Sequence, residues 1–386
     1  MVNAKPKVLF EIYVIPHYQV PFLTELNKHV DLLVMASRDK TVKGLKDIQD
    51  NLPFKNIRVE SSKRGIYHPE IFNVIESFKP NVIVSWNTSL RTMLMDKRIN
   101  IILREKKIKT IWTGCDGYET QNFFVGLLAE FLPWRLGRTL RDFLVTRRVT
   151  HFIAHSSHMQ NFLRRVKLVP QRKITLTHNA IDTSKISDLY KLWKGQGKPR
   201  KSYGIIFTGR LIFGKKIDML VKAFKAILPD YPEATLTIVG EGPAKENLEK
   251  LSQDLGIQNN IIFTGGIYDD ALLAEPLYDN SLFILPGVGG LSFNTAMSCG
   301  LTIIHTHADG TEEDLIRNGV NGWFFDGSEK DLIKKIKGAF QDPKKLKVMG
   351  EKSEDFITNK FNLQNMINDY VKVIERVACI NQENEK

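Results

Sequence analysis

The sequence FTGRLIFGK, residues Phe207–Lys215, opens a series of short blocks rich in apolar residues and glycine. The blocks that follow are TIVGEGP (Thr237–Pro243), IIFTGGI (Ile261–Ile267), LFILPG (Leu282–Gly287) and VGGLSFNTAMSCGL (Val288–Leu301). Apolar runs bounded by glycine or proline predict strands, and the segments between them have helical periodicity. Alternation at this interval predicts a parallel, doubly wound α/β sheet. We expect its strands at residues 205–208, 234–239, 260–264, 281–286 and 301–305.

The glycines are placed where such a sheet binds ligands, at the carboxyl ends of its strands. The turn Gly287–Gly290 leads into an apolar helical segment, Leu291–Cys299. Free N–H groups at a helix start suit a phosphate, and Arg210 and Lys215 add cations from another strand end. The pattern predicts a diphosphate site, although an ordinary tight turn would leave the same glycines. Neither a GxGxxG fingerprint nor a P-loop is present.

In order and spacing, these blocks resemble the donor-binding half of the retaining, GT-B-fold glycosyltransferases of family 4, also called glycosyl transferases group 1. The resemblance implies two Rossmann-like, doubly wound α/β domains that face a central cleft. It also implies a hexosyltransferase-type enzyme that transfers a sugar from a nucleotide diphosphate sugar, with no cofactor and no metal. The donor-binding residues that it implies are Arg210, Lys215, Gly240, Tyr268, Gly289, Gly290, Leu291, Ser292 and Thr295.

One part of the family pattern is degenerate. Its members usually have two glutamates eight positions apart (E-x7-E), the first near the donor sugar and the second on the ribose hydroxyls, and here Gly287 and Thr295 stand in those places. A hydroxyl in place of the second carboxylate loses about 1.5–3 kcal/mol of charged hydrogen bonding unless another group compensates. A non-catalytic sugar-nucleotide-binding or scaffold subunit is therefore an alternative, although such a subunit need not keep Arg210 and Lys215.

The first half of the chain is predicted to form another α/β domain, with strands at 8–15, 31–35, 82–86, 110–113 and 151–154. His17, in the turn IPHYQVP, and Asp116, in GCDG, each follow one of these strands. They are the candidate catalytic residues, and each is equally compatible with a simple turn role. His151, His155 and His158 have a metal-like spacing, but a strand followed by a helix would turn them apart. Of His305 and His307, one is expected to face the site.

The domains are expected to be an acceptor-side domain at 1–190, a polar linker at 191–203 and a nucleotide-sugar-binding domain at 204–360. The segment 361–386 has an amphipathic helix, which in the family crosses back to the first domain. Three cysteines among 386 residues are too few for a disulfide framework, which favours a cytoplasmic location. The apolar run near the N-terminus contains Glu11 and ends at Pro16, so we interpret it as a strand and not as a signal peptide.

Charge is placed unevenly along the chain. Residues 1–200 hold 34 Lys/Arg and 17 Asp/Glu, whereas residues 201–386 hold 21 and 26. In the basic half, residues 123–148 mix aromatic and aliphatic residues with arginine, which predicts an element that lies on a membrane; a core helix with a basic face is the alternative. Expected partners are a nucleotide sugar, a glycan or lipid-linked acceptor and an anionic membrane surface on the inner face of the cell membrane. The pathway expected is bacterial surface polysaccharide or lipopolysaccharide synthesis. No nucleic-acid module accompanies the basic charge, so no nucleic acid is expected.

Overall fold

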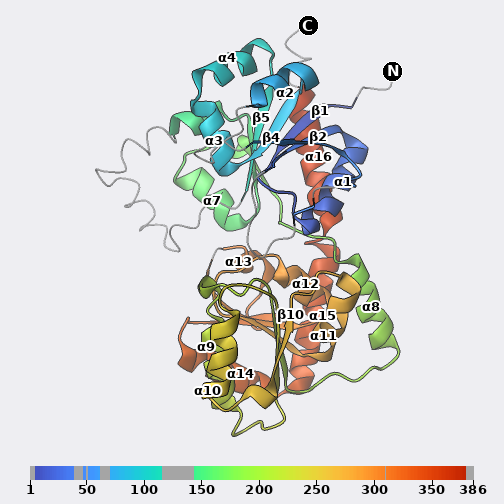
Figure 1. Ribbon diagram of the computed structural model, residues 1–386, viewed down its shortest axis with the longest axis vertical. Coiled ribbons are helices and arrows are strands. Elements are labelled where there is room, and N and C mark those ends of the chain that lie inside the picture. Colours follow the sequence, from blue (N-terminus) through green and yellow to red (C-terminus); the bar gives the residue numbers. More distant parts are fainter. Residues whose placement is uncertain are drawn as a thin grey trace, which may run out of the picture. The chain divides into compact units, whose positions relative to one another are not determined.

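The computed structural model describes residues 5–38, 47–48, 51–60, 70–114, 143–308 and 310–379. The chain divides into two compact units, one of Met1–Asn179 with Leu363–Lys386 and the other of Ala180–Asn362 (Figure 1). Each unit is an α/β sheet in which every pair of neighbouring strands is parallel. The prediction of two doubly wound, Rossmann-like sheets is confirmed.

The first unit has a seven-stranded sheet in the order β3-β2-β1-β4-β5-β6-β7. Its strands are β1 (Lys7–Glu11), β2 (Asp31–Ser37), β3 (Lys55–Val59), β4 (Val82–Trp86), β5 (Lys109–Gly114), β6 (His151–Ala154) and β7 (Ile174–Leu176). Its helices are η1 (His17–Gln19), α1 (Val20–His29), α2 (Ile71–Phe78), α3 (Asn87–Met95), α4 (Lys97–Glu105), α7 (Ser157–Arg165), η2 (Gln171–Lys173) and α16 (Leu363–Cys379).

The second unit has a six-stranded sheet in the order β10-β9-β8-β11-β12-β13. Its strands are β8 (Gly204–Thr208), β9 (Thr235–Val239), β10 (Ile261–Gly265), β11 (Leu282–Leu285), β12 (Thr302–Thr306) and β13 (Gly322–Phe325). Its helices are α8 (Ser184–Gly195), η3 (Phe213–Lys215), α9 (Ile217–Ile227), α10 (Lys245–Asp254), η4 (Gln258–Asn260), α11 (Asp270–Asp279), α12 (Ser292–Ser298), α13 (Glu312–Leu315), α14 (Glu329–Phe340) and α15 (Pro343–Asn359).

Helices cover both faces of the second sheet (Figure 1). Helix α9 packs against α14 and α10, whereas α8 packs against α11, and α12 packs against α15. All residues of β8 and β11 are buried, as expected for central parallel strands between two helical layers. The aromatic pair Phe283 and Phe293, with ring centroids 5.8 Å apart, joins β11 to α12 within this core.

The boundary between the units differs from the expected linker at 191–203. It falls at residue 180, and the first part of that linker is the end of helix α8. The physical reason is apolar burial: Tyr190 and Trp193 pack against the core of the second unit. At the other end of the chain, α16 belongs to the first unit, where Tyr370 packs against Phe22 with ring centroids 4.9 Å apart.

Strand β1 ends at Glu11 and not at residue 15 as expected. Residues 12–16 continue as irregular backbone, in which the Ile15 amide donates to the Asp47 carboxylate at 2.9 Å. Among the described residues, no helix is both long enough and apolar enough to cross a lipid bilayer.

Candidate functional site

The order of the second sheet reverses between β8 and β11, which are neighbours although two strands separate them in sequence. Ligands of doubly wound sheets bind beside such a reversal, outside the carboxyl ends of the strands. The segments that leave these two ends are Gly209–Lys215 and Gly287–Ser292. We call them together the switch-point site. The sequence blocks that predicted a diphosphate site therefore meet at the place where this fold binds ligands.

Lys215 joins the two segments. Its Nζ donates to the carbonyl oxygens of Val288, at 3.1 Å, and of Gly289, at 2.9 Å, and the residue is 8% exposed. A backbone bond from the Val288 amide to the Gly214 oxygen, at 3.0 Å, adds a second link. The positive charge of Lys215 is thus fixed beside the glycine-rich turn by carbonyl groups that lie 73 and 74 positions away in sequence.

Three buried polar atoms of this site have no hydrogen-bond partner within the described part of the chain. They are Thr208 Oγ1 at the end of β8, Arg210 Nε two residues later and Ser292 Oγ at the start of α12. A buried polar atom without a partner costs about 1–3 kcal/mol, and native structures contain few of them. Two hydroxyls and a guanidinium N–H that lack partners at a switch point indicate the place of a polar, anionic ligand.

Position 287, where the resemblance leads one to expect the first glutamate, has no room for a side chain. A Cβ atom at Gly287 would lie 2.1 Å from the Gly214 oxygen and 2.7 Å from the Lys215 Cα, both of which are backbone atoms. The η3 turn therefore occupies the space that a side chain at position 287 would need. Gly240, with φ of 153°, is constrained in the same way, because its Cβ would lie 1.9 Å from the Gly209 oxygen.

Thr295, at the place of the second glutamate, is turned to its own helix. Its hydroxyl donates to the Ser292 oxygen at 2.9 Å, and the residue is 6% exposed. Its proton is therefore used within the helix, and the low exposure of the residue leaves little of its oxygen accessible to a ribose hydroxyl, which argues against the predicted role of Thr295. Helix α12 also has only seven residues, so its dipole is a minor part of any anion binding compared with Lys215 and Arg210.

The remaining predicted donor-binding residues border the same carboxyl edge. Gly290, with φ of 143°, faces the Lys215 ammonium, which would lie 3.9 Å from a Cβ atom there. Leu291 is the N-cap of α12, and Gly289 is buried. Tyr268 follows β10 and is 46% exposed, with its ring against Gly266. Tyr268 therefore lies at the same carboxyl edge of the sheet, after the outer strand β10, which β9 separates from β8.

Of the two candidate catalytic residues, Asp116 lies outside the described residues, as does most of the segment 123–148. His17 begins the turn η1 in the first unit, and its ring contacts Tyr18 edge to face with centroids 5.5 Å apart.

Sequence reasoning missed a buried carboxylate at the reversal of the first sheet, between β1 and β4. Glu11, the last residue of β1, is 1% exposed and accepts hydrogen bonds from the hydroxyls of Ser85, its register partner in β4, and of Ser89, at 2.6 Å. The sequence feature that could have shown it is a single acidic residue in an otherwise apolar strand, because a buried carboxylate needs hydrogen-bond donors around it.

The histidines occupy structural positions or the surface. His305 is fully buried, with Nδ1 against the Leu285 oxygen and its ring 4.8 Å from that of Phe293, so it does not face the site. His155 bridges Thr113 and Tyr370, at 3.0 Å and 2.9 Å, and burial lowers its pKa to about 4.

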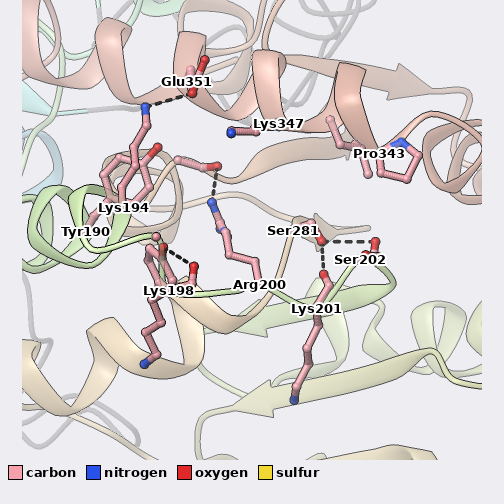
Figure 2. Close-up of a pocket in the computed structure, with 14 residues that line it drawn as sticks. Tyr190, Lys194, Lys198, Arg200, Lys201, Ser202, Ser281, Pro343, Lys347 and Glu351 are labelled. Atoms are coloured by element: carbon pink, nitrogen blue, oxygen red, sulfur yellow. Dashed lines mark hydrogen bonds and ion pairs between the residues drawn. The ribbon is translucent and has the colours of Figure 1, made fainter.

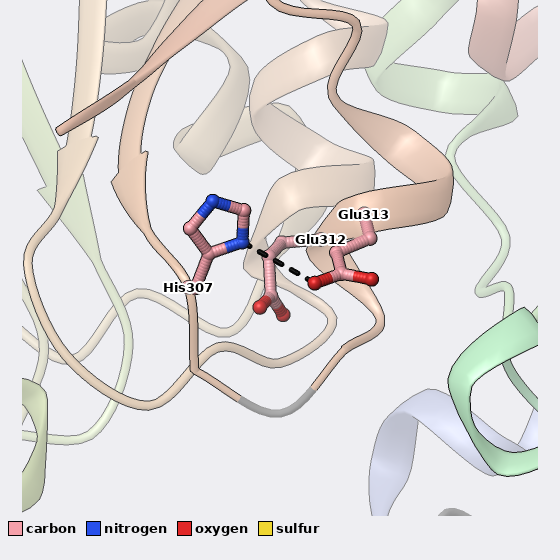
Figure 3. A group of neighbouring side chains, drawn as sticks. All are labelled: His307, Glu312 and Glu313. Atoms are coloured by element: carbon pink, nitrogen blue, oxygen red, sulfur yellow. Dashed lines mark hydrogen bonds and ion pairs between the residues drawn. The ribbon is translucent and has the colours of Figure 1, made fainter. Parts of the chain in front are cut away.

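His307 is exposed and stacks on Phe324 with ring centroids 4.3 Å apart. Figure 3 shows His307 beside Glu312 and Glu313, whose ligand atoms lie within 4.8 Å of one another. The Ala308 amide donates to Glu312 at 2.6 Å, and His307 Nδ1 lies 3.3 Å from Glu313. These bonds give both carboxylates a role in holding the loop after β12.

Comparisons with known proteins show which proteins the whole chain and its second unit are similar to. A sequence model described as "Glycosyl transferases group 1" matches residues 191–356. An uncharacterized glycosyltransferase of Methanocaldococcus jannaschii is 23% identical over 395 residues, which cover 95% of this chain and 99% of that protein. A GDP-mannose-dependent alpha-(1-6)-phosphatidylinositol monomannoside mannosyltransferase of Mycolicibacterium smegmatis is 28% identical over 172 residues, 40% of this chain and 44% of that protein. The crystal structure of Anabaena HepE in complex with UDP superposes with a TM-score of 0.70 at 17% identity, covering 96% of this chain and 100% of HepE.

Proposed function

This chain belongs to the group 1 glycosyltransferases and has the GT-B fold, and from this we propose that it transfers a sugar with retention from a nucleotide diphosphate sugar to a glycan or lipid-linked acceptor. The observation that carries the proposal is the switch-point site, where Thr208 Oγ1, Arg210 Nε and Ser292 Oγ have no hydrogen-bond partner among the described residues and lie beside the Lys215 ammonium. A donor diphosphate has the charge and the acceptor oxygens that such a site requires.

The chemistry proposed for these residues is electrostatic. When the bond from the sugar to the diphosphate breaks, negative charge grows on the leaving oxygen, and fixed cations nearby stabilise that charge. Arg210 offers a guanidinium fork and Lys215 an ammonium point charge, which suit phosphate oxygens in different ways. We propose that these two cations do the work that a metal ion does in other transferases, and that no metal is needed.

The nucleotide is proposed by comparison. HepE binds UDP, and the mycobacterial relative is dependent on GDP-mannose, so UDP and GDP sugars are the donors to test first. Because the Thr295 hydroxyl donates to its own helix, we propose that groups other than this side chain recognise the ribose.

The acceptor is proposed to be carried by a lipid at an anionic membrane, in bacterial surface polysaccharide synthesis. Support comes from the excess of 34 Lys/Arg over 17 Asp/Glu in residues 1–200, since each basic residue near an anionic surface contributes about 1 kcal/mol of attraction. Changing Arg135, Arg138 and Arg141 to Glu should abolish co-sedimentation with anionic vesicles at low salt. Equal sedimentation of the variant and the parent protein would make a soluble acceptor the better proposal.

The enzymatic test is a panel of UDP, GDP and dTDP sugars, incubated with and without undecaprenyl-linked glycan acceptors. Transfer from one donor, or slow hydrolysis of it, supports a catalyst, and the anomeric configuration of the product tests retention. Tight nucleotide binding without any turnover would favour the alternative, a non-catalytic sugar-nucleotide-binding or scaffold subunit, for which the degenerate positions Gly287 and Thr295 are the specific observation. Absence of both binding and turnover would contradict the proposal.

A further inference from the structure

A cavity of about 310 Å³ opens at the opposite edge of the second sheet from the switch-point site (Figure 2). Its residues precede strands: Ser202 comes before β8, Ser281 before β11 and Gly300 before β12. The side walls come from helix α8, the segment 197–202 and the start of α15. Because the two sites lie at opposite ends of the same parallel strands, this cavity is not part of the proposed donor site.

Arg200 lies at the centre of this cavity without a carboxylate partner within the described residues. Its Nε donates to the Asn280 oxygen at 3.0 Å and its Nη1 to the Gly300 oxygen at 3.2 Å, and its Nη2 also donates to the Asn280 oxygen. Three of its five N–H groups are thus used by backbone carbonyls. The guanidinium carbon is 5.1 Å from the ring centroid of Tyr278 and 6.0 Å from that of Tyr190. Carbonyls and aromatic faces fix the guanidinium but leave its net charge in place.

The described lining residues include four further cations, Lys194, Lys198, Lys201 and Lys347, and one acidic residue, Glu351. Lys198 pairs with Glu275 at 3.1 Å and lies 3.8 Å from Asp279. Glu351 pairs with Lys194 at 2.9 Å. Lys201 and Lys347 are both exposed and have no ion pair within the described residues. The second unit as a whole has 23 Lys/Arg and 24 Asp/Glu in residues 180–362. The local excess of positive charge at this cavity therefore comes from Arg200, Lys201 and Lys347, which have no carboxylate partner within the described residues.

The wall that carries Arg200 is preformed. The Tyr278 hydroxyl donates to the Lys198 oxygen at 2.9 Å, and the Lys201 amide donates to the Asp279 oxygen at 2.8 Å. Figure 2 shows Lys194 on α8 and Lys347 on α15 on the same side of the Arg200 guanidinium, whereas the side chains of Lys198 and Lys201 extend away from it. A binding site that is already ordered loses less conformational entropy when its ligand arrives.

We propose that this cavity binds the phosphate group of a small phosphorylated molecule, at a second site separate from the donor site. A fixed guanidinium with lysines beside it is the arrangement that recognises phosphate. A volume of about 310 Å³ is at the lower end of the range of ligand pockets. That volume suits a phosphomonoester of glycerol or sugar size and is small for a complete nucleotide sugar.

The test is calorimetric titration of inorganic phosphate and of glycerol 3-phosphate into the full chain, with and without saturating UDP. Lys347→Glu is the test variant, because it reverses a cavity charge on an exposed side chain. Lys352→Glu is the matched control, since Lys352 is exposed on the same helix and does not line the cavity. Lys347→Glu should weaken phosphate binding at least about tenfold, the effect of losing a charged hydrogen bond, and Lys352→Glu should leave it unchanged.

The two sources of such a phosphate are distinguished by a second arm with phosphatidic acid vesicles. Vesicle binding that Lys347→Glu reduces and Lys352→Glu does not, without binding of free phosphate, would assign the site to a lipid headgroup. Phosphate and vesicle binding that are both absent, or equal in the two variants, would overturn the proposal. Arg210→Ala, in the switch-point site, should leave phosphate binding at the cavity intact. Loss of nucleotide binding with phosphate binding retained would therefore count against the proposed function alone, and the reverse result would count against the phosphate site alone.

Discussion

The Nζ atom of Lys215 lies 2.9 Å from the carbonyl oxygen of Gly289, so a cation that follows β8 closes the turn that follows β11. Neutral carbonyl oxygens are weaker partners for an ammonium group than phosphate oxygens are. We therefore expect a diphosphate to draw Lys215 away from these carbonyls. The turn would then be free to adjust to the ligand, and binding would be coupled to a local rearrangement of Val288–Gly290.

Gly287→Ala should destabilise the protein, because the new Cβ would lie 2.1 Å from the Gly214 backbone oxygen. Forced overpacking of this kind costs about 1–3 kcal/mol of unfolding free energy. The matched control is Gly214→Ala, on the other side of the same contact, where the nearest atom to a Cβ is the Val288 Cγ2 at 3.8 Å. Urea denaturation should show a loss for Gly287→Ala only. Equal stability of the two variants would remove the steric account of the missing glutamate.

Ser292→Ala and Thr295→Val should separate a ligand-binding hydroxyl from a structural one. The Ser292 hydroxyl is buried and has no partner in the part of the chain that the structure describes, whereas the Thr295 hydroxyl donates to the helix backbone at 2.9 Å. A neutral hydrogen bond contributes about 0.5–1.5 kcal/mol, so Ser292→Ala should weaken nucleotide binding by roughly that amount. Thr295→Val should change it little. The opposite ranking in a binding titration would restore Thr295 as a donor contact.

The sequence predicts the central strands of both sheets because central parallel strands read as continuous apolar runs, as in β11, LFIL. It misses β3, KNIRV, whose charged and exposed residues do not form such a run. The end of α8 is also wrongly predicted as linker, because its sequence contains lysines and a glycine, which are typical of linkers, and Trp193 is the one aromatic residue there.

The site is predicted in part, since its glycines and cations mark strand ends. The contact of Gly287 with Gly214 joins residues far apart in sequence, so no local pattern shows that a side chain is excluded there. The same holds for Thr295, whose bond to the Ser292 oxygen depends on the side-chain rotamer and not on residue type.

Acid should destabilise the first unit through His155. Burial lowers the pKa of His155 to about 4, with His178 nearby as a lesser cause, so the neutral ring is the folded form. The unfolded chain takes up a proton near pH 6.5, so this stability is complete above pH 6.5 and is lost as the pH falls toward 4. The loss is about 3 kcal/mol in unfolding free energy. The unfolding free energy, measured by urea denaturation at several pH values between 7 and 4, should fall less with decreasing pH for His155→Gln than for the parent protein. An equal fall in the two proteins would contradict this assignment.

Removal of divalent metal should leave sugar transfer unchanged. Arg210 and Lys215 are proposed to stabilise the leaving diphosphate, and the group of His307, Glu312 and Glu313 is already bonded within its loop. Turnover measured with EDTA and with added magnesium should agree within about twofold. A strong loss with EDTA that Glu313→Gln reproduces would give this group a metal-binding role.

The measurement that tests the central claim most directly is calorimetric titration of UDP and GDP into the parent protein and into Arg210→Ala and Lys215→Ala. Each variant should lose about 1.5–3 kcal/mol of binding free energy, the range of a charged hydrogen bond. Lys222→Ala, an exposed lysine on α9 that pairs with Asp218 at 3.5 Å, is the control and should bind as the parent does. Unchanged nucleotide affinity in both Arg210→Ala and Lys215→Ala, with the fold intact, would contradict a donor site between β8 and β11.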